Sequence, residues 1–233
     1  RQRQMCIRDS MYPILRRVAR KAYFLPTYID GSRFECKRKI FSDEKVKFLY
    51  VGRFDKEKGI DVLIKALRNI VRKHNMANFE FYFIGHGSLE TIIKKLAQEN
   101  PCVKYVGAVD NKEMPLWYNK IDVVVLPSYT EGMPAVLLEA LLCKRLVIAT
   151  EVGSIPLLLR DTKGNKYGIL VSPGNSKELA ETILRIINGE KTQYYSMVIK
   201  ERERVKALLR LYERNIMKHL HIKNGRSLKG MKG

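Results

Sequence analysis

The sequence predicts an α/β fold in which a parallel, Rossmann-like sheet carries helices on both faces. Two observations predict this fold. Short runs rich in β-branched residues, typical of buried strands, alternate with longer segments whose apolar residues recur at helical spacing. Glycines stand at several of the junctions where a strand gives way to a helix. Strands joined through helices in this order form parallel sheets with right-handed crossovers.

Each expected strand is a short run of mainly β-branched or aromatic residues. The strands, in chain order, are residues 46–51, 79–84, 103–106, 122–126, 146–149 and 168–171. The longer expected helices carry apolar residues on one face, as Ile60, Leu63 and Leu67 do in the first. The helices are residues 59–73, the segment from the turn at 85–87 to about residue 98, and then 111–118, 135–143, 153–159 and 176–187. Trp117 and Tyr118 are expected to pack in the core.

Composition bounds the class of protein. The chain has 233 residues, of which 45% are hydrophobic, enough for a domain with a buried core. Its four cysteines show no Cys-x-x-Cys spacing, which argues against a disulfide framework or a zinc site and fits a reducing compartment. No apolar run approaches the ~18 residues of a membrane span, and the opening residues lack the apolar core of a signal peptide. We therefore expect a cytoplasmic location.

The net charge of +20 is concentrated at the two ends of the chain. Residues 1–44 hold 11 Lys and Arg against 5 Asp and Glu, and residues 190–233 hold 12 against 4. Such ends can be solvated helix faces, or they can bind an anionic membrane surface or nucleic acid. We expect that the chain could attach peripherally to the inner membrane face.

The segment from Asp122 to Cys143 predicts a ligand site. A strand ends in a turn that leads into an apolar helix, and Pro134 fits the start of that helix because its missing N–H would be unpaired there. Ligands bind at the carboxyl edge of such sheets, and a helix N-terminus favours phosphate. Glu131 is either a first-turn acid that complements the helix dipole or a ligand for hydroxyl groups. Glu139 is either a solvated helix residue or a second acceptor for ligand hydroxyl groups, about 10 Å from Glu131.

Two loops with glycines follow the first and second strands. In residues 52–59, Arg53 and Lys58 could grip a diphosphate, because flanking glycines let the backbone approach and both cations bind phosphate. Basic loop residues are more often merely solvated, so this pattern is weak by itself. Gly85 and Gly87 open the next loop, where a tight turn is a commoner role than a ligand cradle.

Together these motifs resemble the donor site of glycosyltransferase family 4, whose members are retaining enzymes of the GT-B fold. The pattern Ser-x-x-Glu-Gly-x-Pro-x-x-x-Leu-Glu-Ala, from Ser128 to Ala140, carries the family's two glutamates with seven residues between them. Gly-Arg-x-x-x-x-Lys-Gly at residues 52–59 matches its phosphate-binding pair. The resemblance covers residues 24–187. The chain departs from the family at Leu157, where a glutamate is common.

The resemblance implies a role for each motif residue. Arg53 and Lys58 would hold the donor diphosphate and stabilise it as it leaves, and Glu131 would contact the transferred sugar; these three are the expected catalytic residues. The expected donor-binding residues are Gly52, Gly85, Gly87, Val109, Ser128, Gly132, Met133, Pro134 and Glu139. Among them, Glu139 would bind the ribose and Val109 would lie beside the base. The donor would be a UDP- or GDP-linked sugar, and no metal is expected because the chain has no Asp-x-Asp motif.

The resemblance also implies a domain organisation. Residues 1–22 are expected to be an artefact with a remnant of a missing N-terminal domain, and residues 23–44 an interdomain linker. Residues 45–189 would form the nucleotide-sugar-binding domain, residues 190–222 the C-terminal helices and residues 223–233 a disordered tail. Residues 1–10 resemble translated sequencing-adapter sequence and are excluded from the fold, whereas 11–22 are basic and helical in pattern. The C-terminal helices carry an apolar stripe at Val205, Leu208, Leu209, Tyr212 and Ile216.

We expect from this the donor-binding domain of a polysaccharide-biosynthesis enzyme that transfers a hexose to a glycan or lipid-linked acceptor. The acceptor side would lie in the missing domain, so the chain alone would be inactive. Two alternatives are a basic α/β module that binds nucleic acid and a fragment of a GT-B nucleotide-sugar epimerase or phosphorylase. No arginine-aromatic RNA motif or helix-turn-helix pattern supports nucleic-acid binding.

Overall fold

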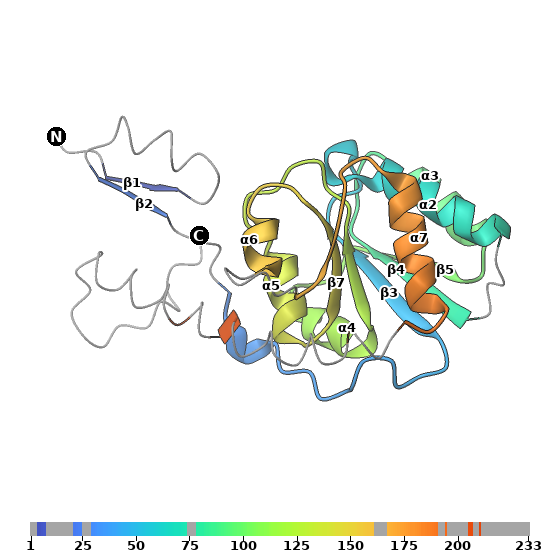
Figure 1. Cartoon of the computed structure of the whole chain (residues 1–233), viewed down its shortest axis with the longest axis horizontal. Helices are drawn as coiled ribbons and strands as arrows, with labels where there is room; N and C mark the ends of the chain where they lie inside the picture. Colours follow the sequence, from blue (N-terminus) through green and yellow to red (C-terminus); the bar gives the residue numbers. More distant parts are fainter. Residues whose placement is uncertain are drawn as a thin grey trace.

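A six-stranded, all-parallel sheet with the spatial order β5-β4-β3-β6-β7-β8 forms the centre of the molecule (Figure 1). The computed structural model describes residues 4–7, 21–24, 29–73, 78–160 and 167–190, together with residues 194, 205, 206 and 210. The strands of the sheet are β3 (Val46–Val51), β4 (Phe79–Ile84), β5 (Val103–Gly107), β6 (Val123–Leu126), β7 (Leu146–Thr150) and β8 (Ile169–Val171). They lie where the alternating pattern predicted them, and the expected α/β, Rossmann-like class is confirmed.

Helices cover both faces of the sheet (Figure 1). They are α2 (Ile60–Lys73), α3 (Glu90–Glu99), α4 (Met114–Lys120), α5 (Ala135–Leu142), α6 (Ile155–Leu159) and α7 (Ser176–Ile187), with short 3-10 helices η1 (Gly31–Arg33) and η2 (Lys56–Lys58). Successive strand residues point to opposite faces. Phe48 therefore joins the core formed with α2, α3 and α7, whereas Leu49 joins the core formed with α4, α5 and α6.

The chain changes direction across the sheet between β3 and β6. From β3 it builds outward through β4 to β5, and then crosses back to place β6 on the other side of β3. At such a switch point the loops after the two neighbouring strands run apart, which leaves a crevice at the carboxyl edge where ligands bind. The loop from Gly52 to Gly59 follows β3, and the loop from Pro127 to Pro134 follows β6. The topology thus brings together the two loops that carry the predicted site.

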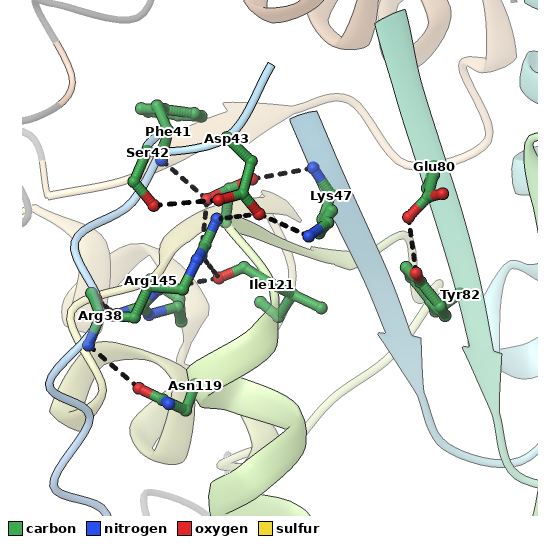
Figure 2. A network of polar contacts seen from close by, with 11 residues as sticks. Arg38, Phe41, Ser42, Asp43, Lys47, Glu80, Tyr82, Asn119, Ile121 and Arg145 are labelled. Atoms are coloured by element: carbon green, nitrogen blue, oxygen red, sulfur yellow. Dashed lines mark hydrogen bonds and ion pairs between the residues drawn. The ribbon is translucent and has the colours of Figure 1, made fainter. Parts of the chain in front are cut away.

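A buried polar network fastens the segment ahead of β3 to the start of β6 (Figure 2). The carboxylate of Asp122 is fully buried and accepts hydrogen bonds from the N–H groups of Phe41 (2.7 Å) and Lys47 (2.8 Å). It also pairs with Nη1 of Arg38 at 3.0 Å. Arg145, likewise buried, donates to backbone carbonyls that include that of Arg38. The segment is therefore tied to the domain through two buried charged side chains, those of Asp122 and Arg145.

Apolar side chains of the same segment complete the attachment. Ile29 and Phe34 are buried in the core that contains α4 and α5, and Ile40 is buried in the core on the opposite face. Phe34 meets the ring of Tyr118 edge-on, with 5.9 Å between ring centroids. The predicted linker, as far as the structure describes it, thus packs against the sheet domain over much of its length.

Most of the expectations for the first residues fall outside the described residues. The pattern predicts a helix over 11–22, of which only the last two residues are described, and excludes 1–10 from the fold. Those two residues are extended: β2 (Lys21–Phe24) pairs in parallel with β1 (Gln4–Ile7), apart from the six-stranded sheet (Figure 1). The adjacent aromatic residues of β2 favour this extended backbone.

The starts of α4 and α5 show how single residues set the end of a helix. Helix α4 begins at Met114 rather than at 111, because Asp110 accepts a hydrogen bond from the N–H of Lys112 (2.7 Å) and holds a turn ahead of the helix. Helix α5 begins at Ala135, as expected, and Pro134 is the residue before it, with an extended ψ of 120°.

Several predictions fall outside the described residues. Val205 is helical and buried, but the rest of the apolar stripe, Leu208, Leu209, Tyr212 and Ile216, is not described, and neither are the tail at 223–233 and most of the basic ends. Within the described part of the chain, no helix combines the length and the apolar character needed to cross a membrane.

Candidate functional site

The loops after β3 and β4 are packed backbone against backbone. The N–H of Phe54 donates to the carbonyl of His86 at 2.8 Å. A Cβ atom at Gly85 would lie 2.0 Å from the carbonyl oxygen of Gly52, and one at Gly87 would lie 2.6 Å from the nitrogen of Phe54. Both glycines are therefore explained by the close approach of the two loops. This packing accounts for them without a ligand, as the commoner sequence interpretation has it.

Arg53 presents its guanidinium group to solvent at the carboxyl edge of the sheet. Its side chain is 60% exposed and pairs with Asp55 (2.8 Å) and more distantly with Glu57 (3.7 Å). The hydroxyl of Tyr50, on β3, donates to the Arg53 carbonyl at 2.7 Å and so holds the backbone of the loop at Arg53. An exposed ion pair of this kind is weak, so the guanidinium group can exchange its partner for a stronger anion.

The loops after β3 and β6 touch at Gly59. This residue has a φ of +67°, and a Cβ atom there would lie 1.8 Å from the carbonyl oxygen of Pro127, so only glycine fits. The N–H of Tyr129 donates to the Glu57 carbonyl at 3.0 Å and adds a second link. As a result the side chains of Lys58 and Glu131, 73 residues apart in sequence, form an ion pair with 2.8 Å between Nζ and Oε1.

The Glu131 carboxylate accepts a second hydrogen bond, from Ser128. The hydroxyl of the buried Ser128 donates to the same Oε1 atom at 2.7 Å, and Thr150 Oγ1 donates to the Ser128 carbonyl at 2.6 Å. The Glu131 side chain is only 10% exposed. On the far side of the turn, a Cβ at Gly153 would lie 1.7 Å from the Glu131 carbonyl oxygen, which fixes the backbone against the loop ahead of α6. The carboxylate is thus positioned with both described bonds on one oxygen.

The N-terminus of α5 lies directly after this carboxylate. Pro134 precedes the helix and its carbonyl accepts from the N–H of Leu137 at 3.2 Å, but no side chain caps the first N–H groups of α5. Gly132 and Pro134 are half-buried, and Met133 is buried. Ser154 donates to the Gly132 carbonyl and braces the turn. The arrangement offers the partial positive charge of a helix start beside Lys58.

Glu139 points inward one to two turns along α5. The hydroxyl of Tyr118, on α4, donates to its Oε2 atom at 2.8 Å. Burial raises the pKa of the Glu139 carboxyl, while the hydrogen bond from Tyr118 and the charge of Arg33 oppose that rise. This glutamate is therefore not the solvated helix residue that one interpretation of the sequence allowed.

Val109 lies in the loop after β5, half-buried against the core that contains α4 and α5. Nothing in its packing assigns it a ligand, so its place beside a nucleotide base stays a prediction. Among the described residues, no three His, Cys, Asp or Glu side chains come together in a way that could hold a metal ion.

The structure adds residues that sequence reasoning missed. Tyr118 packs in the core as predicted, being fully buried, yet its hydroxyl binds a predicted site residue. The signal was available, because a buried tyrosine needs a hydrogen-bond partner where a phenylalanine does not. Thr150 and Ser154 support the turn around Glu131 through backbone carbonyls. Such contacts leave no trace in a single sequence.

Comparison with known proteins identifies relatives of one kind. A family model described as glycosyl transferases group 1 matches residues 45–189. The amylovoran biosynthesis glycosyltransferase AmsK from Erwinia amylovora is 31% identical over 171 residues, which cover 70% of this chain and 41% of that protein. An uncharacterized 41.2 kDa protein in the cps region of Klebsiella pneumoniae is 35% identical over 147 residues, 63% of this chain and 38% of that protein. The chain spans about two fifths of the length of these relatives.

Solved structures agree on the fold. Sucrose-phosphate synthase from Thermosynechococcus elongatus superposes with a TM-score of 0.73 at 24% identity, over 95% of this chain and 59% of that one. Anabaena HepE, solved in complex with UDP and glucose, gives a TM-score of 0.73 at 18% identity, over 93% of this chain and 62% of that one. At these identities the likeness establishes the fold alone.

Proposed function

This chain belongs to the glycosyl transferases group 1 family, and we propose that it forms the donor-binding part of a retaining family 4 enzyme. The donor is a UDP- or GDP-linked hexose, and the acceptor is a glycan or a lipid-linked saccharide. The observation that carries this proposal is the meeting of the loops after β3 and β6, which joins Lys58 to Glu131 at the switch point of the sheet. The family match favours this function over nucleic-acid binding.

Arg53 and Lys58 bind the donor diphosphate in this proposal. Bond cleavage places negative charge on the departing nucleotide, and fixed positive groups lower the barrier by meeting that charge. Arg53 supplies an exposed guanidinium group, Lys58 an ammonium group already fixed in place, and α5 its N-terminal N–H groups. Because these groups neutralise the leaving phosphate, the proposal requires no metal ion.

Glu131 contacts the transferred sugar. Both of its described hydrogen bonds go to Oε1, from Lys58 and from Ser128. Its Oε2 atom is therefore available to a sugar hydroxyl, while Lys58 keeps the carboxylate neutralised beside the diphosphate. A phosphate at the same helix start would repel a bare carboxylate, and the ion pair with Lys58 offsets that repulsion.

The acceptor side lies outside these residues in this proposal. GT-B transfer takes place in a cleft between two domains, where closure orients the reactants and excludes water. The chain spans 41% of the amylovoran glycosyltransferase, so a domain of roughly 150–200 residues, a common domain size, is left to supply the acceptor surface. The 233-residue chain alone should then bind the donor without transferring its sugar.

Calorimetric titration with UDP and GDP tests the phosphate assignment. Arg53→Ala and Lys58→Ala should each weaken binding of the preferred nucleotide by about 1–3 kcal/mol, as for hydrogen bonds to charged groups. Arg185→Ala is the matched control, because it removes an Arg–Glu pair (2.7 Å, with Glu190) at the far end of α7 and should leave affinity unchanged. Binding by either loop variant at the wild-type level would show that the diphosphate does not lie there.

A further inference from the structure

A tyrosine and a glutamate share a hydrogen bond inside the domain, beside the proposed donor site. Tyr118 lies on α4 with its side chain fully buried, and its hydroxyl donates to Oε2 of Glu139 on α5 at 2.8 Å. Glu139 is half-buried and is the fifth residue of α5, the helix that follows the turn that holds Glu131. Two helices that do not touch through backbone bonds are thus linked through one charged acceptor.

Core packing alone does not explain this pair. A phenylalanine at 118 would fill the same space and would need no partner. A carboxylate in this position costs free energy through desolvation, which is why burial raises the pKa of Glu139. The tyrosine hydroxyl offsets part of that cost, because a hydrogen bond to a charged acceptor is stronger than one between neutral groups. The cost of placing a carboxylate here is therefore only partly offset by the contacts within the domain.

The hydrogen bond fixes the direction of that oxygen. In the described part of the chain, Tyr118 is the one donor to the Glu139 carboxylate, and it binds Oε2. The tyrosine ring is restricted in its movement, because it is fully buried and Phe34 meets it edge-on at 5.9 Å and an angle of 67°. Arg33, anchored by its bond to the Asn111 carbonyl at 2.7 Å, places a positive charge near the same carboxylate. Oε1 is left to accept a hydrogen bond from a ligand.

We propose that Tyr118 is a positioning residue for nucleotide recognition: it holds one oxygen of Glu139 and so directs the other at a ribose hydroxyl. Phe34 supports it from the segment ahead of β3, which makes that segment part of the nucleotide site. This inference rests on the proposed function, in which Glu139 binds the ribose. It adds that ribose selectivity depends on a residue that never touches the ligand.

The test compares ribose selectivity rather than affinity. The preferred nucleotide of the UDP and GDP pair and its 2′,3′-dideoxy counterpart are titrated calorimetrically into the wild type and Tyr118→Phe. The wild type should bind the ribose form at least fivefold more tightly. Tyr118→Phe should lower that ratio by about two- to tenfold, as expected for one hydrogen bond. Tyr82→Phe is the matched control, since it removes another Tyr–Glu bond, to Glu80 at 2.6 Å (Figure 2), and should keep the wild-type ratio.

The pH dependence separates positioning from a merely structural role. Protonation of Glu139 on acidification removes an acceptor, so selectivity should fall at low pH, and its midpoint should lie higher in Tyr118→Phe because a bond that lowers the Glu139 pKa is gone. If Tyr118→Phe does not fold, Phe34→Leu, which loosens the ring, should lower the ratio less. An unchanged ratio and midpoint in Tyr118→Phe, beside a selective wild type, overturns the inference and leaves the proposed function standing. A wild type that binds both nucleotides equally overturns the ribose role of Glu139 and the inference together, whereas a wild type that binds neither contradicts the proposed function itself.

Discussion

Replacing Asp122 with asparagine should destabilise the protein by about 3–5 kcal/mol. The side chains have the same shape, so the change removes a charge and turns one acceptor oxygen into a donor. In the structure, Oδ1 accepts from the Phe41 N–H and pairs with Arg38, and Oδ2 accepts from the Lys47 N–H. Whichever way the new amide turns, it faces a backbone N–H that then has no acceptor.

The magnitude follows from these contacts. An unpaired buried N–H costs about 1–3 kcal/mol, and breaking a buried ion pair costs about 3–5 kcal/mol. Arg38 is 19% exposed, so water relieves part of the second cost and the two values do not simply add.

Guanidinium unfolding followed by far-UV circular dichroism measures the effect. Asp110→Asn is the control, because its carboxylate accepts one bond, from the Lys112 N–H at 2.7 Å, in an exposed loop, and it should change stability by less than about 0.5 kcal/mol. A loss of under about 1 kcal/mol in Asp122→Asn would refute the reasoning, since it would mean that the network carries no net stability.

Two further predictions concern the end of α5. Lys144 has a φ of +54° and sits where a glycine is favoured after a helix, because its N–H and that of Arg145 bond back to the carbonyls of Leu141 and Ala140. Lys144→Gly should therefore raise stability by about 1 kcal/mol, whereas Lys144→Ala, which keeps the Cβ strain, should not; equal unfolding midpoints for the two variants would contradict this. The neighbouring Cys36 thiol and burial raise the pKa of the Cys143 thiol, so its thiolate fraction stays small up to alkaline pH. Peptide mapping after alkylation at pH 8 should find Cys143 protected in the folded protein and reactive in denaturant, and equal rates in both states would show that the thiol is neither buried nor suppressed.

The sheet was predictable because its information is local. Runs such as Val123–Leu126 are apolar on both faces, and a parallel sheet between two helical layers requires that. The longer helices on either side were predictable from the helical spacing of their apolar residues. Element ends were less certain, as at α4, where the side chain of Asp110 rather than any propensity decides the first helical residue.

The contacts between the predicted site residues could not be predicted from the sequence. From the sequence, Lys58 was assigned to the diphosphate and Glu131 to the sugar, yet the two side chains, 73 residues apart in sequence, bind each other. Asp122 was assigned to a strand, and its contacts 75 to 84 residues away carry no local signal. Tyr118 was assigned to the core, which is correct for its ring, but the hydrogen bond of its hydroxyl to Glu139 was not predicted. Long-range polar contacts are set by the tertiary fold, so a single sequence cannot reveal them.

The segment ahead of β3 shows that the folded domain begins earlier in the chain than the match to the family model does. The match to the family model begins at residue 45, but the polar interior is complete only with the residues before it. A protein shortened to that point would keep every strand of the large sheet and lose Arg38 and the Phe41 N–H, leaving Asp122 as a buried charge with fewer partners. It would also expose the face of Tyr118 that Phe34 covers. A piece that retains both the buried apolar residues of this segment and the partners of Asp122 therefore starts at or before Ile29, ahead of residue 45, where the match to the family model begins.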